Sequence, residues 1–235
     1  MDVGKNITDL TLVYYSAHAL PKQAEVSIRN ELLKTTKGTF PIISVTQKPI
    51  DFGENICVGE IGQSYYNCFK QIYTAVQRVK TEYVAMTEDD SLYNMEHFSH
   101  RPSSDGVFSY NRNIWFLETN RHQSIFWTKG QTAMLSCIVA SKLLLTILEQ
   151  RFNKYIEEPM PRENQKHAWQ EPGRDEGLGF ANQKTEIFST DIPIIALNYY
   201  GGTGGKLKAR GGSTSAEELE YWGNANDLRK RIFKG

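Results

Sequence analysis

An apolar segment that leads directly into three acidic residues constrains the fold of this chain more than any other feature. Residues 83–87 read Tyr-Val-Ala-Met-Thr, and Glu88, Asp89 and Asp90 follow at once. Such a segment is typical of a strand buried on both faces of a parallel sheet. Open α/β sheets bind their ligands beyond the carboxyl ends of the strands, where these acids would lie. The sequence therefore predicts an α/β fold with an acidic site at one edge of a mostly parallel sheet.

The spacing of the acids indicates a metal site. Side chains two residues apart in an extended segment point the same way, so Glu88 and Asp90 are expected on one side and Asp89 on the other. Glu88 and Asp90, with water and a substrate diphosphate, would form the hard oxygen shell that suits Mg²⁺ or Mn²⁺. The alternative is a solvated acidic turn, because Asp and Glu usually lie on the surface.

The rest of the first half alternates between strand and helix patterns. Strands are expected at residues 10–15 and 41–45, both rich in β-branched and aromatic residues. Helices are expected between them and again before residue 83, where apolar residues recur at helical spacing. The helical stripes consist of Ala24, Ile28, Leu32 and Leu33, and of Tyr65, Phe69, Ile72, Val76 and Val79. Residues 51–60 are read as a loop on the ligand side of the sheet. This order predicts right-handed crossovers and a parallel sheet covered by helices.

The alternation is lost after residue 92. Residues 107–110 and 114–117 are expected to form a hairpin or paired strands. A helix is expected at residues 141–155 with Ser141 as its N-cap, and a last strand at residues 192–197. At 235 residues the chain is long enough for one domain, which we divide into residues 1–92, 93–200 and 201–235.

Composition places the chain among globular proteins and leaves the partner open. Basic and acidic residues balance at 27 each, although residues 201–235 carry seven Lys or Arg against four Asp or Glu. Three cysteines without metal spacing indicate reduced thiols. We expect a cytoplasmic protein, in the host cell if it is viral, because neither a secretion signal nor a membrane span is visible in the sequence.

Four short segments resemble a known family. Residues 42–49, 51–60, 109–113 and 171–174 look like segments of uncharacterised glycosyltransferase-like proteins from phage and environmental viral sequence. More broadly, the chain resembles the metal-dependent glycosyltransferases of the GT-A fold, and the resemblance covers most of residues 9–205. It implies a Rossmann-like sheet with a mixed acceptor-side half. It also implies a nucleotide-sugar donor bound through an Asp-x-Asp motif, which Glu88-Asp89-Asp90 would match.

The resemblance also suggests where substrates are bound. Residues 1–92 would be the nucleotide-sugar-binding half, with Asp51, Glu54 and Asn55 near the nucleoside, although Asp and Asn are also ordinary turn formers. Residues 93–200 would be the acceptor half. Residues 201–235 would be a glycine-rich basic tail, in which Lys206 meets the diphosphate as part of a lid or belongs to a plain linker.

Catalysis would require a carboxylate near the acceptor if the transfer inverts the sugar configuration. Glu171 and Asp175 are the candidates, and a solvated loop is the alternative for both. Many family members carry a metal-binding histidine after the last strand, where this chain has Tyr199 and Tyr200. A protonated phenol is a poor ligand. The candidates to replace it are His18, His97, His100, His122 and His167.

The function expected from these patterns is metal-dependent transfer of a sugar from a nucleotide-sugar to a hydroxyl group. The acceptor suggested by the viral resemblance is a hydroxymethylpyrimidine in phage DNA, with the backbone contacted by basic residues of the tail. Two alternatives stay open. A nucleotidyltransferase could use the same sheet and metal, and a non-enzymatic nucleic-acid-binding module would need neither metal nor nucleotide.

Overall fold

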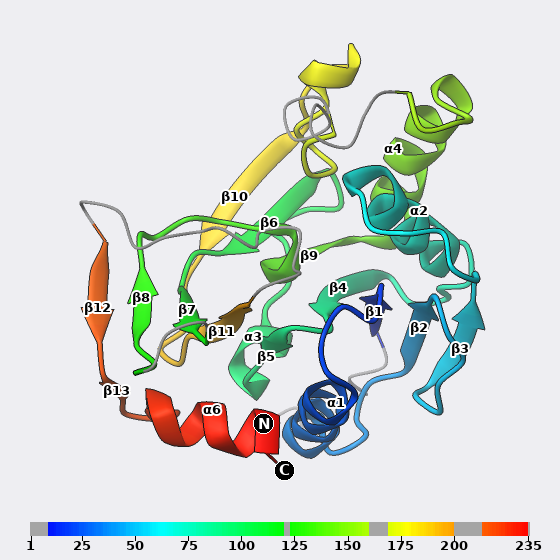
Figure 1. Ribbon diagram of the computed structural model, residues 1–235. Coiled ribbons are helices and arrows are strands. Elements are labelled where there is room, and N and C mark those ends of the chain that lie inside the picture. The colour runs from blue at the N-terminus through cyan, green and yellow to red at the C-terminus, as the bar shows by residue number, and fades with distance from the viewer. Residues whose placement is uncertain (1–8, 120–122, 160–168, 200–212, 235) are drawn as a thin grey trace.

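The chain folds around a seven-stranded sheet, seen in Figure 1 as a computed structural model that describes residues 9–119, 123–159, 169–199 and 213–234. The strand order is β10-β6-β9-β4-β1-β2-β3, and β9 alone runs antiparallel to its neighbours. The strands are β1 (Leu10–Ser16), β2 (Ile42–Thr46), β3 (Glu54–Cys57), β4 (Tyr83–Glu88), β6 (Val107–Asn111), β9 (Cys137–Ala140) and β10 (Lys184–Phe188). Strands β1 and β4 are therefore central, and their carboxyl ends lie side by side.

Side chains of β1 alternate between two apolar cores because successive residues of a strand face opposite ways. Val13 and Tyr15 pack in the core formed with helices α2 (Tyr65–Val76) and α4 (Ser141–Lys154). Leu12 and Tyr14 pack on the other face, towards helices α1 (Lys22–Thr36) and α3 (Met95–Ser99) and the second sheet. Burial on both faces explains why β1, β2 and β4 read as continuous apolar runs.

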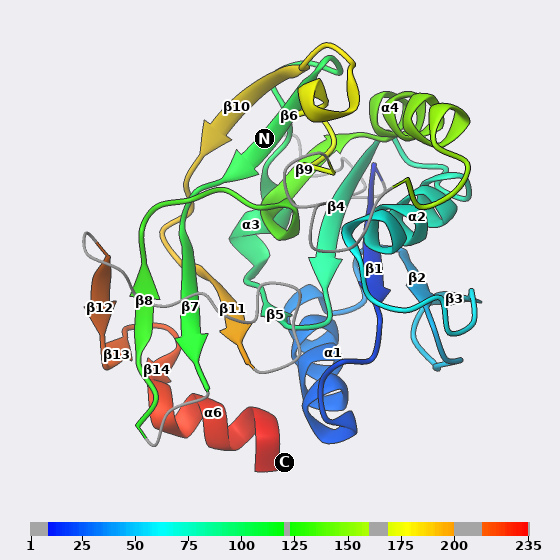
Figure 2. The ribbon, with the colours of Figure 1, turned by 45° about the horizontal axis from the view of Figure 1, so that its top comes forward.

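A second sheet of five strands joins the first. Its order is β12-β8-β7-β11-β5, with β7 and β11 parallel and the other pairs antiparallel. The strands are β5 (Ser91–Leu92), β7 (Ile114–Glu118), β8 (Phe126–Thr128), β11 (Ile194–Asn198) and β12 (Thr214–Ala216). Figure 2 shows helix α6 (Ala225–Lys234) running beneath the ends of β7, β8 and β11. The remaining elements are β13 (Glu218–Leu219), β14 (Gly223–Asn224) and the 3-10 turns η1 (Met134–Ser136) and η2 (Glu176–Leu178).

The predicted fold class is confirmed. The first half is a Rossmann-like parallel arrangement and the second contributes a mixed sheet, as expected for the GT-A fold. The strands expected near residues 10, 41, 83 and 192 and the helices expected before residues 38, 80 and 155 are all present. In the part of the chain that the structure describes, no helix has both the length and the apolar character needed to cross a bilayer.

The expected hairpin at residues 107–117 is wrong. β6 pairs with β9 and β10, whereas β7 pairs with β8 and β11 in the other sheet. The two residues that flank Arg112 explain the change of sheet. Asn111 Nδ2 donates to Thr190 Oγ1 at 2.8 Å, and Asn113 Nδ2 donates to the Thr190 carbonyl at 2.9 Å. These bonds tie the connection to the segment before β11 and direct it into the second sheet.

Two further local predictions are wrong. Residues 51–60 are not a loop throughout, because Glu54–Cys57 forms the edge strand β3 parallel to β2. The turn before it needs Gly53, which has φ +63° and whose missing Cβ would lie 2.4 Å from the Ile42 carbonyl oxygen. Ser141 is not the N-cap of α4, since Ala140 holds that position. The Ser141 hydroxyl instead donates to the Thr81 carbonyl at 2.8 Å.

The end of the chain is more ordered than a tail. Residues 214–234 form β12, β13, β14 and α6, and α6 packs against α1. Leu228 and Ile232 of α6 are buried in one apolar cluster with Ala24 and Ile28 of α1. The basic tail expected at residues 201–235 therefore includes a helix that belongs to the body of the protein.

Candidate functional site

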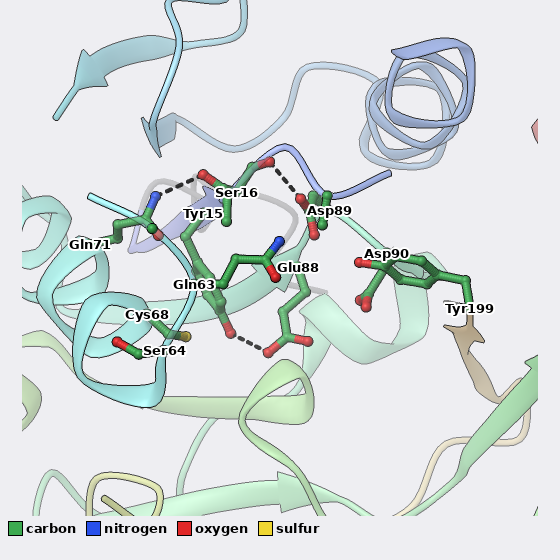
Figure 3. Close-up of a pocket in the computed structure, with 13 residues that line it drawn as sticks. Tyr15, Ser16, Gln63, Ser64, Cys68, Gln71, Glu88, Asp89, Asp90 and Tyr199 are labelled. Carbon is green, nitrogen blue, oxygen red and sulfur yellow. Dashed lines mark hydrogen bonds between the residues drawn. The ribbon is translucent and has the colours of Figure 1, made fainter. Parts of the chain in front are cut away.

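A pocket opens at the carboxyl ends of β1 and β4, where the sequence predicted a ligand site (Figure 3). Its cavity volume is about 80 Å³. The lining residues come from the end of β1, the start of α2, the acidic turn and the end of β11. They are Tyr15, Ser16, Ala17, Ala19, Gly62, Gln63, Ser64, Cys68, Gln71, Glu88, Asp89, Asp90 and Tyr199. Since β1 and β4 pair in register at Tyr15 and Glu88, the acids and the β1 terminus meet directly.

Hydrogen bonds from β1 fix two of the three carboxylates. The Tyr15 hydroxyl donates to Glu88 Oε1 at 2.6 Å, and the Ser16 hydroxyl donates to Asp89 Oδ2 at 2.5 Å. Figure 3 shows both bonds, with the Glu88 side chain lying between Tyr15 and Asp90. The neighbouring strand thus orients the acids before any ligand arrives.

The acidic turn itself is held by the second sheet. The Leu197 amide of β11 donates to the Asp90 carbonyl at 2.8 Å, and the Tyr93 hydroxyl accepts from the Glu88 amide at 3.0 Å. β4 ends at Glu88, so Asp89 and Asp90 lie in a turn. All three acids line the pocket, with Glu88 bonded to Tyr15 and Asp89 bonded to Ser16, the next residue of β1.

Burial and mutual repulsion make the charged forms of the three carboxyl groups unfavourable unless a positive charge is nearby. Burial raises the pKa of Glu88 to about 7, and the charges of Asp89 and Glu171 add to the shift. Burial likewise raises the pKa of Asp89 to about 6, and it raises the pKa of Asp90 well above its ordinary range. Among the described residues, no Lys or Arg lines the pocket. A bound cation would relieve both effects.

The carboxylate oxygens suit a hard divalent ion whose coordination shell would be completed by water and substrate. In the described part of the chain, no three His, Cys, Asp or Glu side chains are arranged to hold a metal by themselves. Mg²⁺ commonly uses only one or two carboxylates and takes its other oxygens from water and substrate phosphates. Glu88 and Asp90 remain the proposed ligands, and Asp89 is a third carboxylate at the same pocket.

Tyr199 directly follows β11, where the family resemblance places a histidine. It lines the pocket together with Asp90, as Figure 3 shows, and it is 7% exposed. Burial and the charges of Asp90, Asp89 and Glu88 raise the pKa of the phenol far above its ordinary value. The hydroxyl therefore stays protonated and is a weak metal ligand.

None of the described histidines lines the pocket. His97 is fully buried among aromatic rings, and burial lowers its pKa to about 3. His100 Nε2 lies 2.7 Å from Ser109 Oγ, away from the acids. His18 is the nearest, because its positive charge would act on Asp89, but its Nδ1 is 2.9 Å from Glu25 Oε2. His122 and His167 lie outside the described residues.

Glu171 belongs to the acceptor half and, like Asp175, does not line the pocket. Burial raises its pKa to about 7, while the charge of Arg174 acts against the shift. Its charge in turn raises the pKa of Glu88, so the two carboxyl groups are close enough to influence each other. The backbone of Met134 hydrogen-bonds Glu171, and Glu171 Oε2 is buried with no hydrogen-bond partner. A carboxyl group in this state is suited to take up a proton near neutral pH.

Asp175, the other candidate base, has a different environment. It is 1% exposed and forms a buried ion pair with Arg151. Its second oxygen accepts from the Gly173 amide at 2.8 Å. The carboxylate therefore has partners within the fold, and it does not line the pocket.

The predicted nucleoside contacts lie at the other end of the sheet. Glu54 begins β3 opposite Ile43 of β2, and Asp51 lies in the turn before it, so both precede the carboxyl edge of the sheet. The Asn55 amide donates to Ser44 Oγ and Thr46 Oγ1, each at 2.9 Å, and thus braces two strands. These residues do not line the pocket. Lys206 lies outside the described residues.

Sequence reasoning missed most of the β1 and α2 contributions to the pocket. Ser16 could have been found, because it follows a strand expected to run parallel to residues 83–87. Gln71 had no such signal. Its Nε2 donates to the carbonyls of Ser16 and Val45, both at 2.8 Å, and so fixes the ends of β1 and β2 from inside α2.

Comparisons with known proteins are distant. No family model and no curated protein matches the chain. Solved structures with a similar course include a glycosyltransferase involved in the glycosylation of the major capsid of PBCV-1, at 10% identity over 80% of this chain and 91% of that one, with a TM-score of 0.46. A structure of S. aureus TarS 1–349 in complex with UDP-GlcNAc gives 13% identity over 86% and 62%, with a TM-score of 0.49. The bifunctional IspDF from Campylobacter jejuni gives 12% over 78% and 50%, with a TM-score of 0.40.

The chain thus spans less than two thirds of the TarS and IspDF chains. At these identities and TM-scores, the likeness concerns only the general course of the backbone.

Proposed function

We propose that this protein is a metal-dependent glycosyltransferase, which moves a sugar from a nucleotide-sugar to a hydroxyl acceptor. The observation that carries the proposal is the convergence of Glu88, Asp89 and Asp90 on one buried pocket that no described Lys or Arg lines. The pKa values of Glu88 and Asp89 are raised to about 7 and about 6, so ionisation of these carboxyl groups is unfavourable in the pocket. A bound cation would favour their charged forms.

Glu88 and Asp90 would hold Mg²⁺ or Mn²⁺ in this pocket. When bound, the ion would supply positive charge to the diphosphate that leaves the sugar. The protein's own contribution is to orient the carboxylates, through the hydrogen bonds from Tyr15 to Glu88 and from Leu197 to the backbone of Asp90. The bond from Leu197 to Asp90 also connects the two halves of the fold at the acidic turn.

The nucleotide would extend out of the cavity rather than fill it. A volume of about 80 Å³ has room for an ion and phosphate oxygens, whereas pockets for whole ligands measure roughly 300–1,000 Å³. Gly62, Gln63 and Ser64, the N-cap of α2, also line the cavity. Backbone amides at a helix start favour a diphosphate there.

Glu171 would serve as the base that removes the acceptor's hydroxyl proton. Its raised pKa of about 7 matches the pH at which such a group works best. The effect of the Glu171 charge on the pKa of Glu88 supports this role, although Glu171 itself does not line the pocket. Asp175 is less suited to this role because Arg151 and the Gly173 amide already occupy its two oxygens.

The acceptor that we propose is a hydroxymethylpyrimidine in phage DNA, and the support for it is the viral resemblance of residues 42–60 and 109–113. Such a base would have to leave the duplex to reach the pocket. Incubation with hydroxymethylated and unmodified DNA of one sequence tests this step. Sugar on the hydroxymethylated DNA alone is expected, and transfer to neither would limit the proposal to another hydroxyl acceptor.

A panel of nucleotide-sugars with and without Mn²⁺ tests the activity itself. Release of a nucleoside diphosphate that depends on the metal and stops in Asp90→Asn is the expected result. Release of pyrophosphate from sugar phosphate and nucleoside triphosphate would instead identify a nucleotidyltransferase. Binding of DNA with a steep salt dependence and no response to metal or nucleotide would favour a nucleic-acid-binding module.

A further inference from the structure

A fully buried arginine connects helix α4 to the segment that carries Glu171. We propose that Arg151 is a positioning residue, which fixes the backbone of residues 170–175 and thereby sets where the Glu171 carboxylate meets the site. The inference rests on the proposed function, in which Glu171 is the base. It concerns a residue whose side chain touches neither the pocket nor Glu171's carboxyl group.

The Arg151 guanidinium uses each of its nitrogens on this one segment. Nη1 donates to the Gln170 carbonyl at 2.8 Å, and Nη2 donates to the Glu171 carbonyl at 2.9 Å. Nε forms the short ion pair with Asp175 Oδ1. The three contacts therefore fix both ends of a six-residue turn, and one of them is on Glu171 itself.

Further contacts stabilise the turn to which Arg151 binds. Asp175 Oδ2 accepts from the Gly173 amide at 2.8 Å, and the Pro172 carbonyl accepts from the Tyr110 hydroxyl at 3.2 Å. The guanidinium lies over the rings of Phe69 and Trp169, whose centroids are 5.2 and 6.0 Å away. Trp169 is 0% exposed. The turn is thus built on Arg151 as a rigid unit.

The side chain of Glu171 is held less firmly than its backbone. Arg174 Nη1 lies 3.6 Å from Glu171 Oε2, which is beyond hydrogen-bond distance, and that oxygen has no hydrogen-bond partner. The carboxylate's own contacts are a hydrogen bond from the Met134 backbone and the nearby charge of Arg174, so its position depends on these and on the backbone that Arg151 fixes. A buried ion pair adds little net stability compared with apolar residues of similar size, so stability alone is a weak explanation for it.

The matched control is on the same helix. Lys154 Nζ donates to the Leu178 carbonyl at 2.7 Å, so Lys154 anchors the same connection at a point beyond the turn that carries Glu171. Lys154→Met removes that anchor, whereas Arg151→Lys keeps a positive charge near Asp175 but cannot reach both carbonyls with a planar fork. The two variants separate general loosening of the connection from displacement of Glu171.

The experiment measures the pKa of Glu171 by ¹³C NMR of labelled glutamate, with Glu171→Gln to assign the signal, beside turnover at several pH values. In Arg151→Lys, we expect the pKa of Glu171 to fall towards the ordinary value as the turn loosens and the carboxyl group meets water. The kcat should fall on the order of 10- to 100-fold, with KM for the donor and Mn²⁺ affinity unchanged. Lys154→Met should match the parent in pKa and kcat.

An unchanged pKa of Glu171 in Arg151→Lys, with a kcat no lower than that of Lys154→Met, would overturn the positioning role. If the parent releases no nucleoside diphosphate from any donor, the proposed function fails, yet the pKa comparison still decides whether Arg151 positions Glu171. If Arg151→Lys does not fold, the double variant Arg151→Leu/Asp175→Leu replaces the buried pair by apolar side chains and is judged by the same pKa.

Discussion

Each of the three consecutive carboxylates at the pocket has a hydrogen bond from a neighbouring hydroxyl group. Tyr15 and Ser16 of β1 each donate a hydrogen bond to one acid, and Ser91 Oγ lies 3.2 Å from Asp90 Oδ1. These bonds favour the charged carboxylates, but burial outweighs them for Glu88, whose pKa rises to about 7. The balance leaves a site that is preorganised for a cation.

Tyr199→His should strengthen metal binding. An imidazole in place of the protonated phenol beside Asp90 adds a good ligand to a shell that has few protein ligands. We expect Mn²⁺ affinity, measured by calorimetric titration, to rise on the order of tenfold. Tyr199→Phe is the matched control and should bind Mn²⁺ like the parent. Equal affinity in all three proteins would mean that residue 199 does not reach the metal.

Glu171→Gln and Asp175→Asn should separate the base from the structural acid. Loss of the Glu171 carboxylate should lower kcat about 100-fold or more, within the usual range for general bases, with little change in melting temperature. Asp175→Asn should instead lower the melting temperature, because it weakens the buried pair with Arg151. The reverse pattern in turnover and thermal unfolding would make Asp175 the base.

The structural role of helix α6 could not be recognised from the sequence. Its buried residues Ala225, Leu228 and Ile232 pack on α1, while its basic residues made the segment look like a tail. Leu228→Ala should therefore lower the free energy of unfolding by about 2–5 kcal/mol, as cavities in a core do. Lys230→Ala, at an exposed position on the same helix, should cost less than about 0.5 kcal/mol in the same urea titration. Equal small losses would leave α6 as a peripheral segment.

The elements with long, periodic apolar patterns could be predicted from sequence, and the short ones could not. β1, β2, β4, α1, α2 and α4 are local patterns that burial on the sheet reinforces. β3 was missed because an edge strand with exposed or half-exposed residues lacks a buried pattern. The separation of β6 from β7 depends on Asn111 and Asn113 reaching Thr190, nearly 80 residues away, which no local pattern contains.

The residues of the candidate site also differ in how well the sequence predicts them. The place of Glu88 and Asp90 could be predicted because the carboxyl ends of parallel strands lie at the same edge of the sheet. Asp51 and Glu54 were expected on the ligand side because the register of β3, which begins opposite Ile43, could not be seen in the sequence. Glu171 and Asp175 are four residues apart in one acidic segment, and only tertiary contacts distinguish their environments.

At the scale of the whole molecule, the cluster should make stability depend on pH and metal. The pKa of Glu88 is raised from about 4.5 to about 7, so between these values the native state binds more protons than the unfolded state. Stability from this group is therefore lost as pH rises through that window. His97 acts in the opposite direction, because its pKa is lowered to about 3.

Comparison with Glu88→Gln removes this carboxylate while His97 is present in both proteins. In EDTA, the stability advantage of the variant should be small at pH 4.5 and grow to at most about 3.5 kcal/mol above pH 7, at about 1.4 kcal/mol per pKa unit. Urea unfolding at several pH values measures it. Mn²⁺ should reverse the order by stabilising the parent alone. A difference that does not vary with pH would show that Glu88 is not strained by burial.

The metal site is tested most directly by calorimetric titration of nucleotide-sugars into the parent and into Glu88→Gln/Asp90→Asn, with and without Mn²⁺. We expect the parent to bind one of the donors only with the metal. The double variant should keep its fold but lose metal-dependent donor binding, because the substitutions preserve shape while removing the charge that a hard cation requires. Donor affinity that is the same in both proteins, or the same with and without Mn²⁺, would contradict the assignment of this pocket as a metal-dependent donor site.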